Sequence, residues 1–108
     1  VSGEETKFGL PADQLINFLK EAVKLRHIAV KGLMTIAPLV EDPEKIRLIF
    51  VGLRELAKKV AQAHIKGVEM KYLSMGMTND FRIAIEEGSN LVRIGTGIFK
   101  DTEDSYWR

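Results

Sequence analysis

Apolar residues along the chain alternate between helical spacing and short compact runs. Leu15 and Leu19 recur at the interval of a helix, and Pro11 suits a first helical position, so we predict a helix over residues 11–26. The compact and largely apolar run of residues 28–36 predicts a buried parallel strand. The predicted order therefore begins with a loop over residues 1–9, followed by a helix and a strand.

The next segment repeats that order. Asp42 before Pro43 is a favourable N-cap, and apolar residues at helical spacing predict a helix from Pro43 to about His64. Residues 68–74, with the sequence VEMKYLS, predict a second strand.

A third helix and strand are expected after a polar loop. We expect Thr78 or Asn79 to cap a short helix, and Gly88 to terminate it. Residues 91–96, LVRIGT, then predict a third strand.

The fold class follows from this order of elements. Alternating helices and strands imply an α/β fold with a parallel sheet and right-handed crossovers. Three such units make somewhat less than half of a (β/α)8 barrel of roughly 250 residues, and the alternative is a small open sheet, complete in itself. We assign residues 1–100 to one domain and residues 101–108 to a polar tail.

Charge and composition exclude several classes of partner. The 16 basic and 15 acidic residues nearly balance, so we expect no nucleic acid and no anionic membrane as partner. No apolar stretch approaches the roughly 20 residues of a membrane span, and the first residues do not resemble a signal peptide. The absence of cysteine favours the cytoplasm. His27 and His64 fit helix ends rather than a metal site, because no second ligand stands at metal spacing.

Two loops that follow strands carry candidate chemistry. Ser74 ends one strand, and Gly76 after it permits a close backbone approach. Gly95, Thr96 and Gly97 leave the next strand, where successive N–H groups could form an anion site. These loops predict a phosphate site at the carboxyl ends of the strands, although glycines at such positions can also serve only to make turns.

Arg93 interrupts an apolar run and therefore needs a partner if the strand is buried. Alternation places Leu91, Arg93 and Gly95 on one face, so Arg93 would point into the cavity that Gly95 lines. A ligand with a phosphate at one end and a ring acceptor, such as pyridoxal phosphate, would suit both. The alternative is a structural ion pair with a core carboxylate such as Glu69.

The segments SGEETKFGL, KGLMTI and YLSMGMTNDFRIAIEEGSNLVRIGTGIF closely resemble the pyridoxal phosphate homeostasis proteins, whose fold is like the N-terminal barrel of alanine racemase. The resemblance implies that Ser74 and the backbone at Gly95 and Thr96 hold the cofactor phosphate, and that Arg93 faces the pyridine nitrogen. It also suggests Met34 and Met75 as residues lining the ring, although unbranched apolar side chains equally suit a core.

The chain also departs from that family. Members often have alanine where Gly97 stands and glycine where Lys100 stands. They are also about twice this length, and their Schiff-base lysine lies in a half that this sequence lacks. The resemblance therefore implies the C-terminal half of a barrel, which would associate with a complementary N-terminal half or with itself.

The function implied is binding, buffering and delivery of pyridoxal phosphate without robust catalysis, so we expect no enzyme. An arginine at the pyridine nitrogen weakens the ring as an electron sink. Two alternatives stay open: an amino-acid racemase on the same barrel, and an unrelated phosphate-binding α/β domain. A racemase needs a second acid or base, for which Tyr72, within a strand, and Tyr106, in the tail, are poorly placed.

Overall fold

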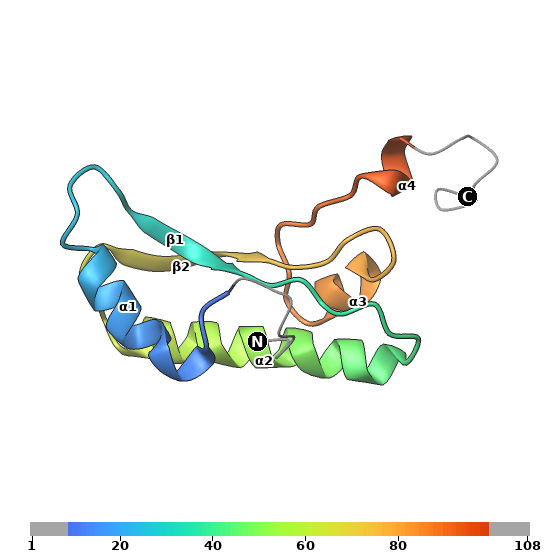
Figure 1. The fold of residues 1–108 in the computed structure, drawn as a ribbon, viewed down its shortest axis with the longest axis horizontal. Helices are drawn as coiled ribbons and strands as arrows, with labels where there is room; N and C mark the ends of the chain where they lie inside the picture. Colours follow the sequence, from blue (N-terminus) through green and yellow to red (C-terminus); the bar gives the residue numbers. More distant parts are fainter. Residues whose placement is uncertain (1–8, 100–108) are drawn as a thin grey trace.

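The computed structural model describes residues 9–99, which form helices packed against a small parallel sheet (Figure 1). Its elements in chain order are the 3-10 helix η1 (Ala12–Gln14), α1 (Leu15–Ala22), β1 (Val30–Met34), α2 (Pro43–Gln62), β2 (Val68–Ser74), α3 (Phe81–Glu86) and α4 (Thr96–Phe99).

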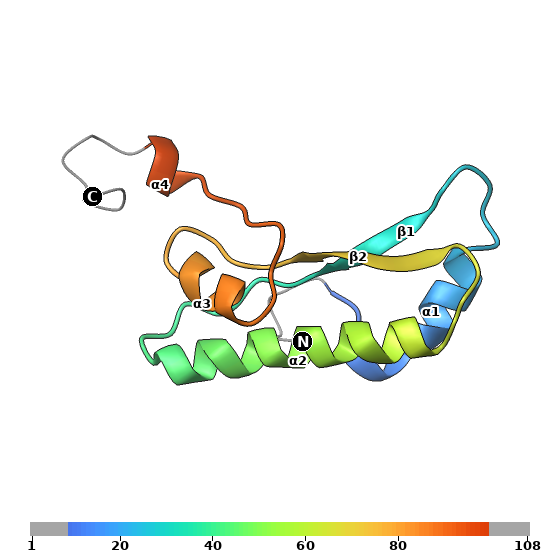
Figure 2. The ribbon, with the colours of Figure 1, turned by 180° about the vertical axis from the view of Figure 1, so that it is seen from behind.

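Strands β1 and β2 pair in parallel, and α2 connects them. Figures 1 and 2 show α1, α2 and α3 on one side of this sheet, while α4 lies on the other side beyond the strand ends. This arrangement confirms the α/β class with parallel strands. The barrel remains a prediction, and the predicted tail lies outside the described residues.

The hydrophobic core fills the space between the sheet and the helices in two clusters. The larger contains Phe50 and Leu53 of α2 together with Leu73 and Ala84. The smaller joins α1 to the second half of α2, and Leu19 and Val60 are its most buried members. Both clusters lie between the sheet and the helices, so the strands are packed on their helical face.

An irregularity in the sheet changes which side chains face the helices. Val30 pairs with Val68 but Gly32 pairs with Tyr72, so two positions along β1 match four along β2. Gly32 lies so close to Tyr72 that an added Cβ would overlap the Tyr72 carbonyl oxygen. After this bulge Leu33 packs against both core clusters, whereas simple alternation from Val30 would place it on the opposite face.

The first helix and the first strand are both shorter than predicted. α1 and β1 cover only the middle of the ranges 11–26 and 28–36. Beyond α1 the amides of Lys24 and Leu25 donate to carbonyls three residues earlier (3.2 and 3.1 Å), which makes tight turns instead of α-helix. His27 then adopts a left-handed φ of 67°, and His64 does the same after α2 with a φ of 51°.

The second helix and the second strand confirm their predictions. Asp42 caps α2, and its side chain accepts a hydrogen bond from the Glu44 amide (3.0 Å). β2 has the predicted bounds. The predicted cap of α3 is wrong, because the N-cap is Asp80, whose carboxylate accepts from the Met77 amide (2.7 Å). Gly88 follows α3 with a φ of 106°, as its terminating role requires.

The third strand is the main correction. Residues 91–96 form only an isolated parallel bridge between Leu91 and Ser74. Beyond the bridge the Arg93 amide donates to the Gly76 carbonyl (2.9 Å), in the loop after β2, and the chain enters α4 at Thr96. The segment therefore follows the end of β2 and the loop beyond it without forming a regular ladder.

No helix within residues 9–99 is long and apolar enough to cross a membrane. In the same described range, no group of three or more histidine, aspartate or glutamate side chains could hold a metal ion.

Candidate functional site

The two loops singled out in the sequence lie side by side at the carboxyl end of the sheet. The Met75 amide donates to the Leu91 carbonyl (3.1 Å), and the Arg93 amide donates to the Gly76 carbonyl (2.9 Å). Gly76 has a φ of 104°, and an added Cβ would lie 2.8 Å from the Cβ of Ala84. Only glycine suits this position, so the loop after β2 is fixed close to α3 and to the segment that carries Arg93.

Ser74 stands in the middle of the strand ends. It pairs with Met34 of β1 on one side and forms the bridge with Leu91 on the other. Its carbonyl accepts from the Thr35 amide (3.1 Å), so its backbone is used by the sheet. Its half-buried hydroxyl bonds to no other residue between 9 and 99, and it can donate to an anion.

The glycine-threonine loop forms the start of α4. Gly97 is buried, and an added Cβ would lie 2.9 Å from a methyl carbon of Ile94 and 3.0 Å from that of Thr78. Its amide donates to the Thr78 hydroxyl (3.0 Å) and is not available for a ligand, contrary to the expected run of three. The amides of Gly95 and Thr96 donate to no side chain or carbonyl in the described part of the chain. The available backbone donors are therefore these two.

Arg93 is exposed, and the residue expected as its structural partner is occupied. Glu69 forms an ion pair with Lys31 (2.8 Å), which lowers the pKa of Glu69 below its ordinary value. The alternative that Arg93 pairs with Glu69 is therefore wrong. The Arg93 Nη2 atom instead donates to the sulfur of Met34 (3.6 Å). A guanidinium whose one side-chain contact within residues 9–99 is a thioether retains most of its hydrogen-bonding capacity for a ligand.

The two candidate methionines lie in different environments. Met34 is 54% exposed on the sheet face away from the helices, beside Arg93. Met75 is 2% exposed within the larger core cluster. The sequence left open whether Met75 lines the ring or fills the core, and in the structure its side chain packs in the core.

Five of the six predicted site residues thus lie on the strand ends or on the segment that follows Leu91. Met34 pairs with Ser74, Arg93 contacts Met34, and the amides of Gly95 and Thr96 follow two and three residues after Arg93. This end of the sheet offers a hydroxyl, a guanidinium, a thioether and two backbone donors. Such a set can bind an anionic group attached to a flat apolar ring that carries an acceptor.

Sequence reasoning missed two side chains that replace the backbone pairing of a third strand. Asn90 accepts from the Leu73 amide and donates to the Lys71 carbonyl, both at 2.8 Å. The Ser89 hydroxyl lies within 3.2 Å of the carbonyls of Leu73, Met75 and Leu91, and its single proton can serve one of them at a time. The polar Ser-Asn pair after Gly88 is the sequence signal for this clamp.

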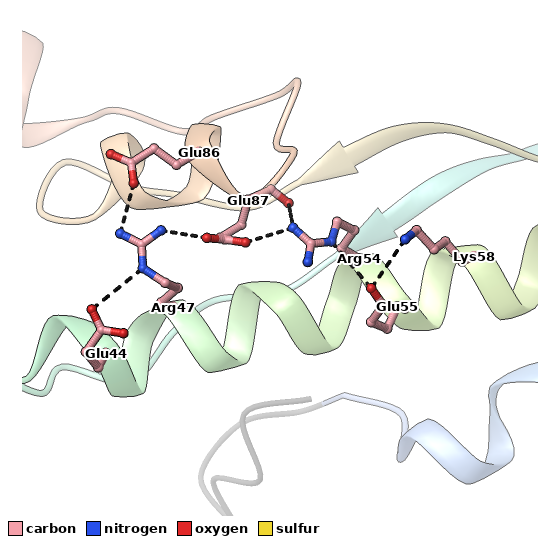
Figure 3. Close-up of polar contacts among 7 residues, drawn as sticks. All are labelled: Glu44, Arg47, Arg54, Glu55, Lys58, Glu86 and Glu87. Atoms are coloured by element: carbon pink, nitrogen blue, oxygen red, sulfur yellow. Dashed lines mark hydrogen bonds and ion pairs between the residues drawn. The ribbon is translucent and has the colours of Figure 1, made fainter.

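A charge network on the helical side was also missed. Figure 3 shows Glu87 between two arginines of α2, with its carboxylate 2.6 Å from Arg47 and 2.7 Å from Arg54. Arg47 also binds Glu86 (2.9 Å). Arg47, and then Arg54, hold the pKa of Glu87 below its ordinary value. Arginines seven residues apart share one helix face, so their spacing in the sequence could have indicated a common partner.

Comparison with known proteins places the chain in a family. The model of the alanine racemase N-terminal domain matches residues 2–103. The pyridoxal phosphate homeostasis protein of Aquifex aeolicus is 44% identical over 99 residues, which are 92% of this chain and 42% of that protein. The protein of the same name from Vibrio cholerae is 38% identical over 104 residues. The chain spans less than half the length of these curated relatives.

Solved structures agree with this assignment. A structure described as an unknown protein from Bifidobacterium adolescentis superposes with a TM-score of 0.84 at 40% identity, over 91% of this chain and 39% of that one. PipY of Synechococcus elongatus, solved with pyridoxal phosphate bound, gives a TM-score of 0.78 at 30% identity, over 87% of this chain and 44% of that one.

Proposed function

This chain belongs to the family of the alanine racemase N-terminal domain, and from that membership we propose that it forms the C-terminal half of a (β/α)8 barrel that binds pyridoxal phosphate. Residues 1–100 would belong to the barrel and residues 101–108 to a tail. The whole barrel is called the full-length protein below. The observation that supports this proposal is the pairing of Ser74, at the carboxyl end of β2, with Leu91, which begins the segment that carries Arg93, Gly95 and Thr96.

Each residue of the site has a distinct role in this proposal. The Ser74 hydroxyl and the amides of Gly95 and Thr96 bind the phosphate, because donors in this arrangement suit a dianion. Arg93 donates to the pyridine nitrogen, and Met34 lies against the ring. Met75 is left to the core. The relative solved with pyridoxal phosphate bound supports the choice of ligand.

The activity we propose is holding and delivering the cofactor without turnover. Bound pyridoxal phosphate supplies an electron sink for amino-acid chemistry, and an arginine at its ring nitrogen weakens that property. The names of the curated relatives, which describe homeostasis, support this choice over an amino-acid racemase. The absence of cysteine favours a cytoplasmic location, and the near balance of charges favours neither nucleic acid nor membrane as partner.

The alternative of an amino-acid racemase can be tested with the full-length protein. The full-length protein should not racemise alanine faster than free pyridoxal phosphate does. Faster exchange of the α-proton with deuterated solvent would instead support the enzyme.

The site is tested by substitution in the full-length protein. Ser74→Ala should weaken the binding of pyridoxal phosphate by about 1 to 2 kcal/mol, which is the scale of one hydrogen bond to a charged group. Arg93→Leu should change the absorption spectrum of the bound cofactor more than its affinity, because the phosphate stays anchored. The measurement is a spectroscopic titration, with the exposed Arg82→Leu on α3 as the control for loss of a positive charge. Variants at Ser74 and Arg93 that both bind and absorb like the wild type would show that the site lies elsewhere.

A further inference from the structure

Thr78 joins the two loops of the candidate site through its side chain. It lies in the loop after β2 and is 8% exposed. Its Oγ1 atom is 3.0 Å from the Gly97 amide nitrogen and 3.1 Å from the Oγ1 atom of Thr96. Within residues 9–99, the Thr78 hydroxyl makes no other hydrogen bond. This contact is additional to the two backbone hydrogen bonds that already hold the loops together.

The number of protons that each group can donate determines the direction of these hydrogen bonds. A threonine hydroxyl has one proton to donate and can accept two hydrogen bonds. The Gly97 amide can only donate, so the Thr78 oxygen accepts from it. The contact between the two hydroxyls can form with either oxygen as donor. If Thr96 donated, the buried Thr78 proton would lack an acceptor, which costs free energy in a site with little access to water.

The favoured order therefore runs from the Gly97 amide to Thr78 and from Thr78 to Thr96. In this order the Thr96 hydroxyl has accepted one hydrogen bond and still has its own proton. Thr96 is exposed, so that proton can point to a ligand. Hydrogen bonds in such a chain strengthen one another, which makes the last donor a better one.

We propose that Thr78 is a positioning residue that turns the Thr96 hydroxyl into a donor to the phosphate, an inference that rests on the proposed function. Thr78 itself does not touch the ligand. An added Cβ at Gly97 would lie 3.0 Å from the Thr78 methyl carbon, so glycine at this position lets α4 lie close enough for the two hydrogen bonds of Thr78.

The test compares two ligands in the full-length protein, pyridoxal phosphate and pyridoxal, which lacks the phosphate. The quantity measured is the ratio of their dissociation constants, so a general loss of folding or ring binding cancels. Thr78→Val keeps the shape but removes the hydroxyl, and it should lower the preference for the phosphorylated ligand about tenfold, the effect of one hydrogen bond to a charged group. Thr78→Ser should keep the wild-type preference. Thr35→Val removes the hydroxyl of another buried threonine, on the strand end at β1, and should leave the ratio unchanged.

A second variant keeps the proposal testable if Thr78→Val does not fold. Thr96→Val leaves the bond between Thr78 and Gly97 intact and should lower the ratio by a similar factor. In the double variant the two losses should not add, because both remove the same donor. An unchanged ratio in Thr96→Val, or additive losses, would overturn the inference. A wild-type protein without preference for the phosphorylated ligand would instead overturn the proposed function.

Discussion

Single glycines set the positions of the strand ends, because their neighbours leave no space for a methyl group. Gly32 is in contact with the backbone of Tyr72, Gly76 with Ala84, and Gly97 with Thr78. Gly95, by contrast, has nothing within 4 Å of an added Cβ. The glycine nearest the proposed phosphate is therefore the one with open space around it, as a ligand would require.

Gly32→Ala should destabilise the chain strongly. Its Cβ would overlap the Tyr72 carbonyl, so β1 and β2 would have to separate locally, and overpacking of this kind costs about 1 to 3 kcal/mol. Urea unfolding followed by circular dichroism measures the loss. Gly9→Ala is the matched control, since nothing lies within 4 Å of its added Cβ. Equal unfolding midpoints for the two variants would show that the sheet relaxes without cost.

Local pattern predicted some features of the site and not others. The alternation of residues 91–95 gave the correct faces, with Leu91, Arg93 and Gly95 exposed and the two residues between them half-buried. The role of Thr78 was out of reach, because its partners lie 18 and 19 residues away and a threonine before a helix is also a normal cap. Non-local hydrogen bonds of this kind leave no periodic signal.

Helices α2 and α3 are joined by the network around Glu87, which also fixes the start of the segment leading to Ser89 and Asn90. The core between α2 and α3 is apolar, and apolar packing does not by itself fix the orientation of two helices. The directional hydrogen bonds of the network fix the orientation of α3 on α2. It thereby supports the position of the candidate site from the helical side.

The contribution of Glu87 should depend on pH in a defined direction. Its pKa is lowered from the ordinary 4.5, so the folded chain binds its proton at lower pH than the unfolded chain does. The stabilisation is therefore complete above about pH 4.5 and is lost as the pH falls below that value. Glu87→Gln should lower the urea midpoint at pH 7, and the difference from wild type should shrink in acid.

The control for this experiment is Glu21→Gln. It removes an exposed carboxylate of α1 that pairs with Lys24. It should change the midpoint little at either pH. A constant difference between Glu87→Gln and wild type across the acid range would show that the two arginines do not stabilise the folded carboxylate.

Elements were predicted well where their own residues determine them. α2 has a cap, a proline and an unbroken apolar face, and β2 alternates apolar with charged residues along its first half, so both predictions were correct. The third strand was not, because the Asn90 side chain occupies the Leu73 amide and the Lys71 carbonyl that a neighbouring strand would use. The bulge at Gly32 likewise depends on Tyr72, far along the chain.

The described part of the molecule has one covered and one uncovered side. All three longer helices pack on the same side of the sheet (Figure 2), and Met34, Tyr72 and Leu91 are 54, 41 and 39% exposed. Exposed apolar groups beside strand edges favour association. In the proposed barrel, the complementary half would cover them.

The 108-residue chain alone should therefore not persist as a compact monomer at high concentration. We expect it to bind a complementary N-terminal half, or otherwise a second copy of itself through the strand edges, with antiparallel contact across a two-fold axis. Sedimentation over a dilution series, read together with circular dichroism, measures this. A cooperatively melting monomer at every concentration would favour the small, complete α/β domain over the half-barrel.

His27 and His64 precede β1 and β2, at the opposite end of the strands from the site, and lie in the left-handed conformation that glycine adopts more easily. A side chain costs about 1 to 2 kcal/mol there, and the greater freedom of glycine in the unfolded chain offsets part of the gain. His64→Gly should thus raise the free energy of unfolding by about 0.5 to 1 kcal/mol, measured in urea, with unchanged cofactor affinity in the full-length protein. A lower midpoint would mean that the imidazole makes a contact worth more than the strain.

This separation has an evolutionary consequence. Substitutions that relieve strain at the two histidines can accumulate without disturbing the strand ends that carry Ser74 and Arg93. A lineage that gained such stability could tolerate otherwise disruptive changes in the binding loops, and so explore other phosphorylated ligands on the same scaffold.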